Sequence, residues 1–97
     1  MDALTQHDRE AALQALPDWS YDDLRGALYR RIVLADFSAA FGLMTRIALA
    51  AEKSDHHPEW FNVYNRLEIW LTTHDAGGVS VRDTAMAGTI DRLLQAS

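Results

Sequence analysis

A long apolar segment that repeats at helical spacing constrains this fold most. Asp36 can cap a helix that begins at Phe37, and apolar residues recur at helical spacing up to Glu52. The apolar positions are Phe37, Ala40, Phe41, Leu43, Met44, Ile47, Ala48, Ala50 and Ala51. Because they occupy more than one side of the helix, we expect it to pack on a sheet of its own chain and against another subunit. The predicted assembly is a homodimer or homotetramer.

Two segments in which polar and apolar residues alternate flank this helix. Asp22 to Gly26 supplies a turn in the first segment, and Asn65-Arg66 supplies one in the second. Alternation on both sides of a turn is typical of a β-hairpin. The four predicted strands span residues 19–21, 27–34, 60–64 and 67–74.

Capping signals place one helix at each end of the chain. Thr5 can cap a first helix that Pro17 stops, and Ser80 with Asp83 three residues later forms a capping-box pattern for a third helix. The predicted order is therefore αββαββα. This order indicates an α+β fold in which three helices are packed on one face of a four-stranded antiparallel sheet. No linker or repeat interrupts it, so we expect a single domain over residues 1–97.

The composition excludes several classes of partner. The chain has nine Lys and Arg residues against 14 Asp and Glu residues, a formal net charge of −5. Phosphate binding depends on positive charge, so we expect neither nucleic acid nor an anionic membrane as a partner. Cysteine is absent, which excludes disulfides, thiolate nucleophiles and cysteine-based metal sites. With no leader-like N-terminal pattern and no apolar run of membrane-spanning length, the expected location is cytoplasmic.

Histidine is concentrated where the central helix ends. His56 and His57 precede Pro58, and His74 follows the second hairpin. Proline disfavours the helical conformation at the residue before it, so the histidine pair is expected in extended chain just beyond the helix. Imidazole has an ordinary pKa of about 6.5 and can both give and take protons near neutral pH. The cluster therefore favours general acid–base catalysis in a cleft.

Two other interpretations of the histidines remain open from the residues alone. The pair could be ordinary surface composition. A metal site is less favoured, because adjacent side chains in extended chain point to opposite sides and no two histidines have the i, i+4 spacing of a helical ligand pair. We therefore predict no metal ligand in this chain.

The residues around the histidines resemble those of a known family. Glu52-Lys53-Ser54-Asp55-His56-His57-Pro58-Glu59-Trp60, followed by Tyr64, Thr73-His74 and Asp83, is similar to the pattern of the pterin-4a-carbinolamine dehydratases. The spacing is the specific part, and the resemblance covers most of the chain. The fold known for that family, a four-stranded antiparallel sheet with three helices, agrees with the order predicted above.

The resemblance implies a lyase that removes water from a 4a-hydroxytetrahydropterin and yields the quinonoid dihydropterin. The substrate is the product that aromatic amino acid hydroxylases release, so the enzyme would serve pterin recycling. The step involves no redox change, and the resemblance implies neither a metal nor an organic cofactor. The only small-molecule partner implied is the pterin.

The resemblance also implies roles for individual residues. His56, His57 and His74 would be the catalytic set, with His56 and His74 approaching the 4a carbon from opposite faces and His57 orienting the ring. The implied substrate contacts are Pro58 and the backbone of Thr73, Asp75 and Ala76. Glu52 and Asp83 would hold the histidines in place.

The family resemblance carries an alternative of a different class. Animal members of the family also act as dimerisation cofactors for a homeodomain transcription factor, so an interaction or regulatory protein without catalysis is the second hypothesis. Such a role needs an exposed helical surface, which Phe37, Phe41 and Met44 could supply. The intact histidine set favours the enzyme.

Overall fold

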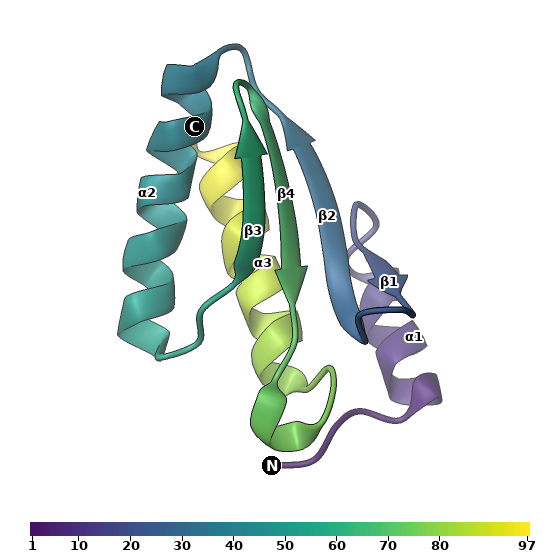
Figure 1. The fold of residues 1–97 in the computed structure, drawn as a ribbon. Helices are drawn as coiled ribbons and strands as arrows, with labels where there is room; N and C mark the ends of the chain where they lie inside the picture. The colour runs from purple at the N-terminus through teal and green to yellow at the C-terminus, as the bar shows by residue number, and fades with distance from the viewer.

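The computed structural model describes residues 1–97 as a twisted sheet with helices against one face (Figure 1). Its element order confirms the predicted αββαββα arrangement and adds one short 3₁₀-helix, η1, before the last helix. The elements are α1 (Gln6–Gln14), β1 (Ser20–Asp22), β2 (Ala27–Val33), α2 (Phe37–Ser54), β3 (Glu59–Val63), β4 (Arg66–Leu71), η1 (His74–Ala76) and α3 (Val81–Gln95).

The sheet has the strand order β1-β2-β4-β3, and every neighbouring pair is antiparallel. The central strands β2 and β4 are paired so that Leu28 lies opposite Leu71 and Ile32 lies opposite Leu67. All four of these side chains are buried. Alternation along the strands thus gives the sheet one apolar face, which the helices cover.

The core lies between this face and the two longer helices. Leu43 and Ile47 of α2 and Met86 and Ile90 of α3 join the strand residues in one cluster of 14 buried hydrophobic residues. Leu13 of α1 is partly buried against the same cluster. None of the three α-helices combines the length and the apolar character that crossing a bilayer requires.

Helix α2 has two apolar sides of different kinds. Its cap is the predicted one, since the Asp36 carboxylate accepts a hydrogen bond from the Ala39 backbone N–H at 2.8 Å. The buried side consists of Ala40, Leu43, Ile47 and Ala51. Phe37 and Phe41 are 49% and 56% exposed. Two of the helix's largest apolar side chains therefore face solvent in the single chain.

The second hairpin differs from the prediction at its turn and at its end. The turn is Tyr64-Asn65 rather than Asn65-Arg66, because Val63 pairs with Arg66. Strand β4 ends at Leu71 instead of reaching His74. Beyond it, Thr73 and Gly78 form an isolated bridge with backbone hydrogen bonds of 3.0 and 3.3 Å. This bridge closes a loop, so His74 begins a 3₁₀-helix and is not a strand residue.

Candidate active site

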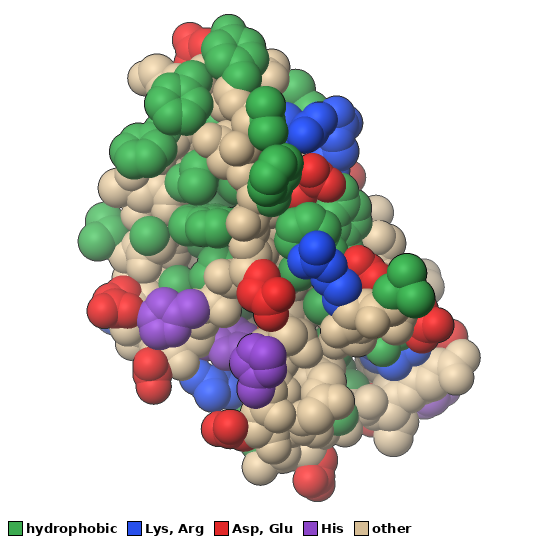
Figure 2. Space-filling view, viewed as in Figure 1, with side chains coloured by type: hydrophobic (Ala, Val, Ile, Leu, Met, Phe, Trp, Pro, Cys, Tyr) green, Lys and Arg blue, Asp and Glu red, His purple; other side chains and the backbone are tan.

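A cavity of about 400 Å³ is lined by residues of the segment after α2, of η1 and of the start of α3. Its size suits a small organic ligand. Histidine side chains gather with acidic ones low on the face shown in Figure 2, while hydrophobic side chains gather along α2. The lining is polar or charged except for one proline. The lining residues are Asp55, His56, His57, Pro58, Glu59, Thr72, Thr73, His74, Asp75 and Arg82.

The end of α2 sets the directions of the two adjacent histidines. Asp55 adopts the left-handed conformation (φ 50°, ψ 43°), and the His56 backbone N–H donates to the Ala51 carbonyl at 3.0 Å. This is the hydrogen-bond pattern of a helix that stops abruptly. Pro58 then disfavours a helical conformation at His57. As a result the two side chains diverge: His56 is buried, whereas the His57 side chain is 57% exposed.

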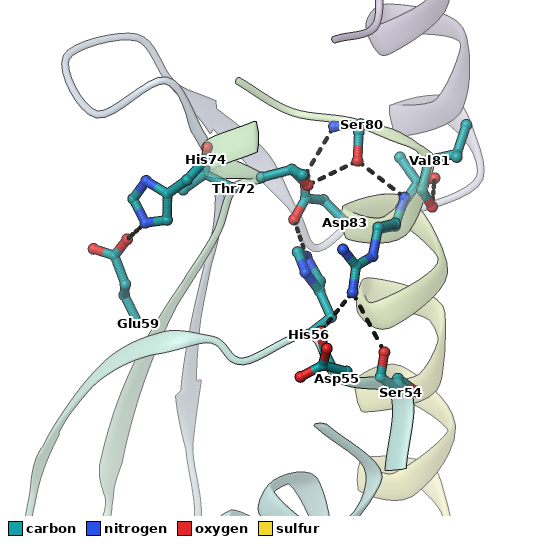
Figure 3. A network of polar contacts seen from close by, with 12 residues as sticks. Ser54, Asp55, His56, Glu59, Thr72, His74, Ser80, Val81 and Asp83 are labelled. Atoms are coloured by element: carbon teal, nitrogen blue, oxygen red, sulfur yellow. Dashed lines mark hydrogen bonds and ion pairs between the residues drawn. The ribbon is translucent and has the colours of Figure 1, made fainter. Parts of the chain in front are cut away.

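His56 is held by a fully buried carboxylate. Its Nε2 lies 2.5 Å from Asp83 Oδ1. Figure 3 marks this contact between the two side chains with a dashed line. The other oxygen of Asp83, Oδ2, accepts from Thr73 Oγ1 at 2.7 Å and from the Ser80 backbone N–H at 2.8 Å. Because a carboxylate oxygen accepts, we assign the imidazole proton to Nε2. This leaves Nδ1 of His56 as the nitrogen available to a ligand.

The Asp83 carboxylate that holds His56 also caps the first turn of α3. Ser80 caps the helix by accepting from the Arg82 backbone N–H at 3.2 Å, and Asp83 completes the predicted capping box. Thr73 Oγ1 lies 2.7 Å from Ser80 Oγ and links the end of the sheet to this turn. The Thr73 backbone N–H and carbonyl are both hydrogen-bonded within the loop that follows β4. Thr73 therefore supports the site through its side chain, and its backbone contact with substrate stays a prediction.

The other two histidines face carboxylates near the surface. His57 Nε2 lies 2.6 Å from Glu52 Oε1, and both side chains are exposed. His74 Nε2 lies 3.9 Å from Glu59 Oε2, and the His74 side chain is 87% exposed. His56, His57 and His74 thus each have a carboxylate of their own, but only His56 is fixed in a buried network. No three His, Asp or Glu side chains converge in the way that a metal centre requires.

Three of the predicted site residues do not line the cavity, and for two of them this is the predicted position. Glu52 and Asp83 reach the cavity only through His57 and His56. Ala76 does not line the cavity, and its backbone N–H donates to the Thr73 carbonyl at 3.0 Å.

Four lining residues were not predicted as site residues. Asp55 and Glu59 flank the histidine-proline triplet, so their nearness in sequence could have identified them. Thr72 lies two positions before His74 and could have been identified in the same way. Arg82 carried no comparable signal, because only the folded chain brings it to the histidines. The unpredicted lining residues are Asp55, Glu59, Thr72 and Arg82.

Comparison with known proteins identifies the family to which this chain belongs. The model of the family described as pterin 4 alpha carbinolamine dehydratase matches residues 2–93. The chain belongs to this family. Membership confirms the resemblance identified from the sequence and places the chain among hydro-lyases.

Relatives and a solved structure match over nearly the full length. A relative from Rhizorhabdus wittichii, whose name places it in the same family, is 60% identical over 95 residues, which cover 98% of each chain. Another, from Novosphingobium aromaticivorans, is 54% identical over 94% of this chain and 95% of its own length. A crystal structure from Brucella melitensis, described as a transcriptional coactivator/pterin dehydratase, has a TM-score of 0.92 and 46% sequence identity. That match covers 95% of this chain and 98% of the other. The fold predicted from the sequence is thus confirmed by a solved structure.

Proposed function

We propose that this chain dehydrates a 4a-hydroxytetrahydropterin to the quinonoid dihydropterin by histidine general acid–base catalysis. The observation that carries the proposal is that His56 and His74 line one cavity while Asp83 fixes the first of them. Family membership supplies the substrate class. Two imidazoles in one cleft supply the two proton transfers that this reaction needs.

The chemistry needs only proton transfers and the loss of one leaving group. An imidazolium donates a proton to the 4a-hydroxyl, the bond from the 4a carbon to oxygen breaks, and water leaves. A second imidazole, or water, takes a proton from a ring N–H, and the electron pair of that bond forms the new double bond. A positioned general acid or base contributes typically 10²- to 10⁴-fold, and no electron acceptor is required.

The remaining assignments follow the family pattern. His57 would orient the ring, and the pterin edge would contact Pro58, Thr73, Asp75 and Ala76. The cellular role we propose is pterin recycling in the cytoplasm. The proposal includes no metal, organic cofactor or nucleic acid.

An activity measurement tests the proposal directly. The purified protein, with no added metal or cofactor, is mixed with synthetic 4a-hydroxytetrahydropterin, and the quinonoid product is followed by its absorbance. We expect acceleration over the buffer rate that chelator does not change. The double variant His56→Ala/His74→Ala should lose nearly all of this acceleration. A parent protein no faster than buffer would refute the dehydratase assignment.

We further propose that α2 joins subunits into a homodimer or homotetramer. Phe37 and Phe41 are about half exposed, and their ring centroids lie 5.8 Å apart, which makes one continuous apolar surface. Apolar side chains grouped in this way on a monomer mark an interface.

The same surface supports the second candidate function. The Brucella melitensis structure is described as a transcriptional coactivator as well as a pterin dehydratase. A protein partner bound at the exposed side of α2 would give this chain an interaction role without catalysis. The two functions differ in a simple test: substitutions at Phe37 and Phe41 would abolish the interaction, whereas substitutions at His56 and His74 would abolish only the dehydration.

A further inference from the structure

Arg82 is the only lysine or arginine among the residues that line the cavity. Its side chain reaches from the first turn of α3 to the last turn of α2. The guanidinium Nη2 donates to the Asp55 carbonyl at 2.5 Å and lies 3.4 Å from the Ser54 carbonyl, and both acceptor residues are labelled in Figure 3. Neither the fold nor the acid–base chemistry described above has given this side chain a role.

The carbonyls that Arg82 binds belong to the exposed end of a helix. The last four carbonyls of a helix have no partner within it, and this end carries partial negative charge. Asp55 is also held in the left-handed region, which is unfavourable for a residue other than glycine. A fixed cation bound to the Ser54 and Asp55 carbonyls therefore stabilises a backbone conformation that the chain does not prefer by itself.

Two successive residues of α3 hold two successive residues of the histidine segment. Arg82 binds the backbone of Asp55, and Asp83 binds the imidazole of His56. The contact of Arg82 fixes the backbone at Asp55, where the chain leaves α2. The contact of Asp83 fixes the imidazole of His56. With both contacts in place, the direction of His56 is determined at each end.

We propose that Arg82 is a positioning residue of the dehydration reaction, which fixes the backbone at Asp55 and thereby the directions of His56 and His57. The inference rests on the proposed function, in which those two histidines act on the pterin. A displacement of about 1 Å in a reacting group can cost on the order of 100-fold in rate, so loss of this contact should reduce turnover more than binding.

Substitutions at one position separate positioning from substrate contact. Arg82→Gln removes the charge and shortens the side chain, whereas Arg82→Lys keeps a donor that can reach a carbonyl. The matched control is Arg92→Gln on the same helix, since Arg92 is exposed and donates to Thr89 Oγ1 at 3.2 Å, away from the histidines. All three variants are compared with the parent by kcat, KM and thermal unfolding.

We expect Arg82→Gln to lower kcat by about tenfold or more while KM changes by less than about threefold. Arg82→Lys should recover most of the loss, because an ammonium group can donate to the same carbonyls. A guanidinium that bound the substrate by two parallel hydrogen bonds would not be replaced by lysine in this way. A kcat within about twofold of the parent for Arg82→Gln, or a raised KM that lysine does not restore, would overturn the proposal.

A spectroscopic measurement keeps the test independent of the proposed activity. The ¹⁵N–¹H signals of the imidazoles are recorded for the parent and for Arg82→Gln, with His7 in α1 as the internal reference. Positioning predicts that the His56 and His57 signals shift while the His7 signal stays. Unchanged His56 and His57 signals would refute the role of Arg82 even if the parent has no dehydratase activity, whereas shifted signals with an inactive parent would refute only the proposed function.

Discussion

His56 Nε2 and Asp83 Oδ1 lie 2.5 Å apart although 27 positions separate the two residues in the chain. The carboxylate belongs to the first turn of α3, and the imidazole follows the last turn of α2. The packing of these two helices therefore decides which ring nitrogen of His56 is left for a substrate. His57 and His74 have no such buried partner.

Removing the charge of Asp83 should harm both stability and activity. An asparagine has one acceptor oxygen where Asp83 uses two, so Asp83→Asn leaves a buried donor without a partner. We expect the free energy of unfolding to fall by about 1–3 kcal/mol, measured by urea denaturation. The matched control is Glu52→Gln at the exposed pair with His57, which should cost less than about 1 kcal/mol. Equal losses for the two variants would contradict the importance of burial.

His56 and His74 should each act on a different 4a stereoisomer of the substrate. If His56 and His74 act from opposite faces of the ring, His56→Ala and His74→Ala should each retain activity toward one 4a stereoisomer and lose it toward the other. His57→Ala should weaken binding as well as turnover. The measurement is initial rate with each isomer separately, and two single variants with the same preference would refute the opposite-face arrangement.

The exposed side of α2 should control assembly. Phe41→Glu places a charge in the predicted subunit interface and should dissociate the oligomer, as light scattering at micromolar concentration would show. Leu24→Glu is the control, because Leu24 is fully exposed in the turn between β1 and β2. A parent protein that is already monomeric would contradict the prediction.

Asp22 should make the stability of the fold decrease as the pH falls. The Arg25 backbone N–H, followed by the Trp70 indole N–H, donates to the Asp22 carboxylate and lowers its pKa from the ordinary value of 3.8. A lowered folded-state pKa means that the unfolded chain binds the proton more readily. The contribution of Asp22 is therefore complete above the ordinary value and is lost as pH falls through the folded value.

The variant Asp22→Asn should lose less stability than the parent between neutral and acid pH. Thermal unfolding across that range measures the difference, and Asp23→Asn in the same turn is the control. A parent and an Asp22→Asn variant with the same acid dependence would show that the two hydrogen bonds do not favour the ionised carboxylate.

Local signals predicted most of this fold because they survive in the structure unchanged. The caps at Thr5, Asp36 and Ser80 each form the expected hydrogen bond. The predicted position of the turn in the second hairpin was wrong for a physical reason. Asparagine favours turns, but the pairing of Val63 with Arg66 places Tyr64 in the left-handed region at φ 50° instead. The burial of Leu67 and Ile69 on one face determines this register more strongly than the turn does.

The site was predictable where it lies within one stretch of sequence and unpredictable where it does not. The segment around His56 and His57 could be identified because Pro58 marks the end of a helix. The partners of Arg82 are backbone carbonyls 27 and 28 positions away, and a backbone carbonyl has no signature in a sequence. Glu59 lies beside the histidine-proline triplet, but its pairing with His74 could not be predicted, because that distance depends on where the chain leaves the sheet.

The carboxylate that begins α3 is the same one that holds His56, since Asp83 accepts from the Ser80 backbone N–H at 2.8 Å. The first turn of α3 therefore cannot fray without releasing the imidazole. Exchange of the Ser80 amide hydrogen with solvent deuterium occurs only when that turn opens. The exchange rate of this amide therefore reports how often the contact between Asp83 and His56 is lost, and it can be measured without any substrate.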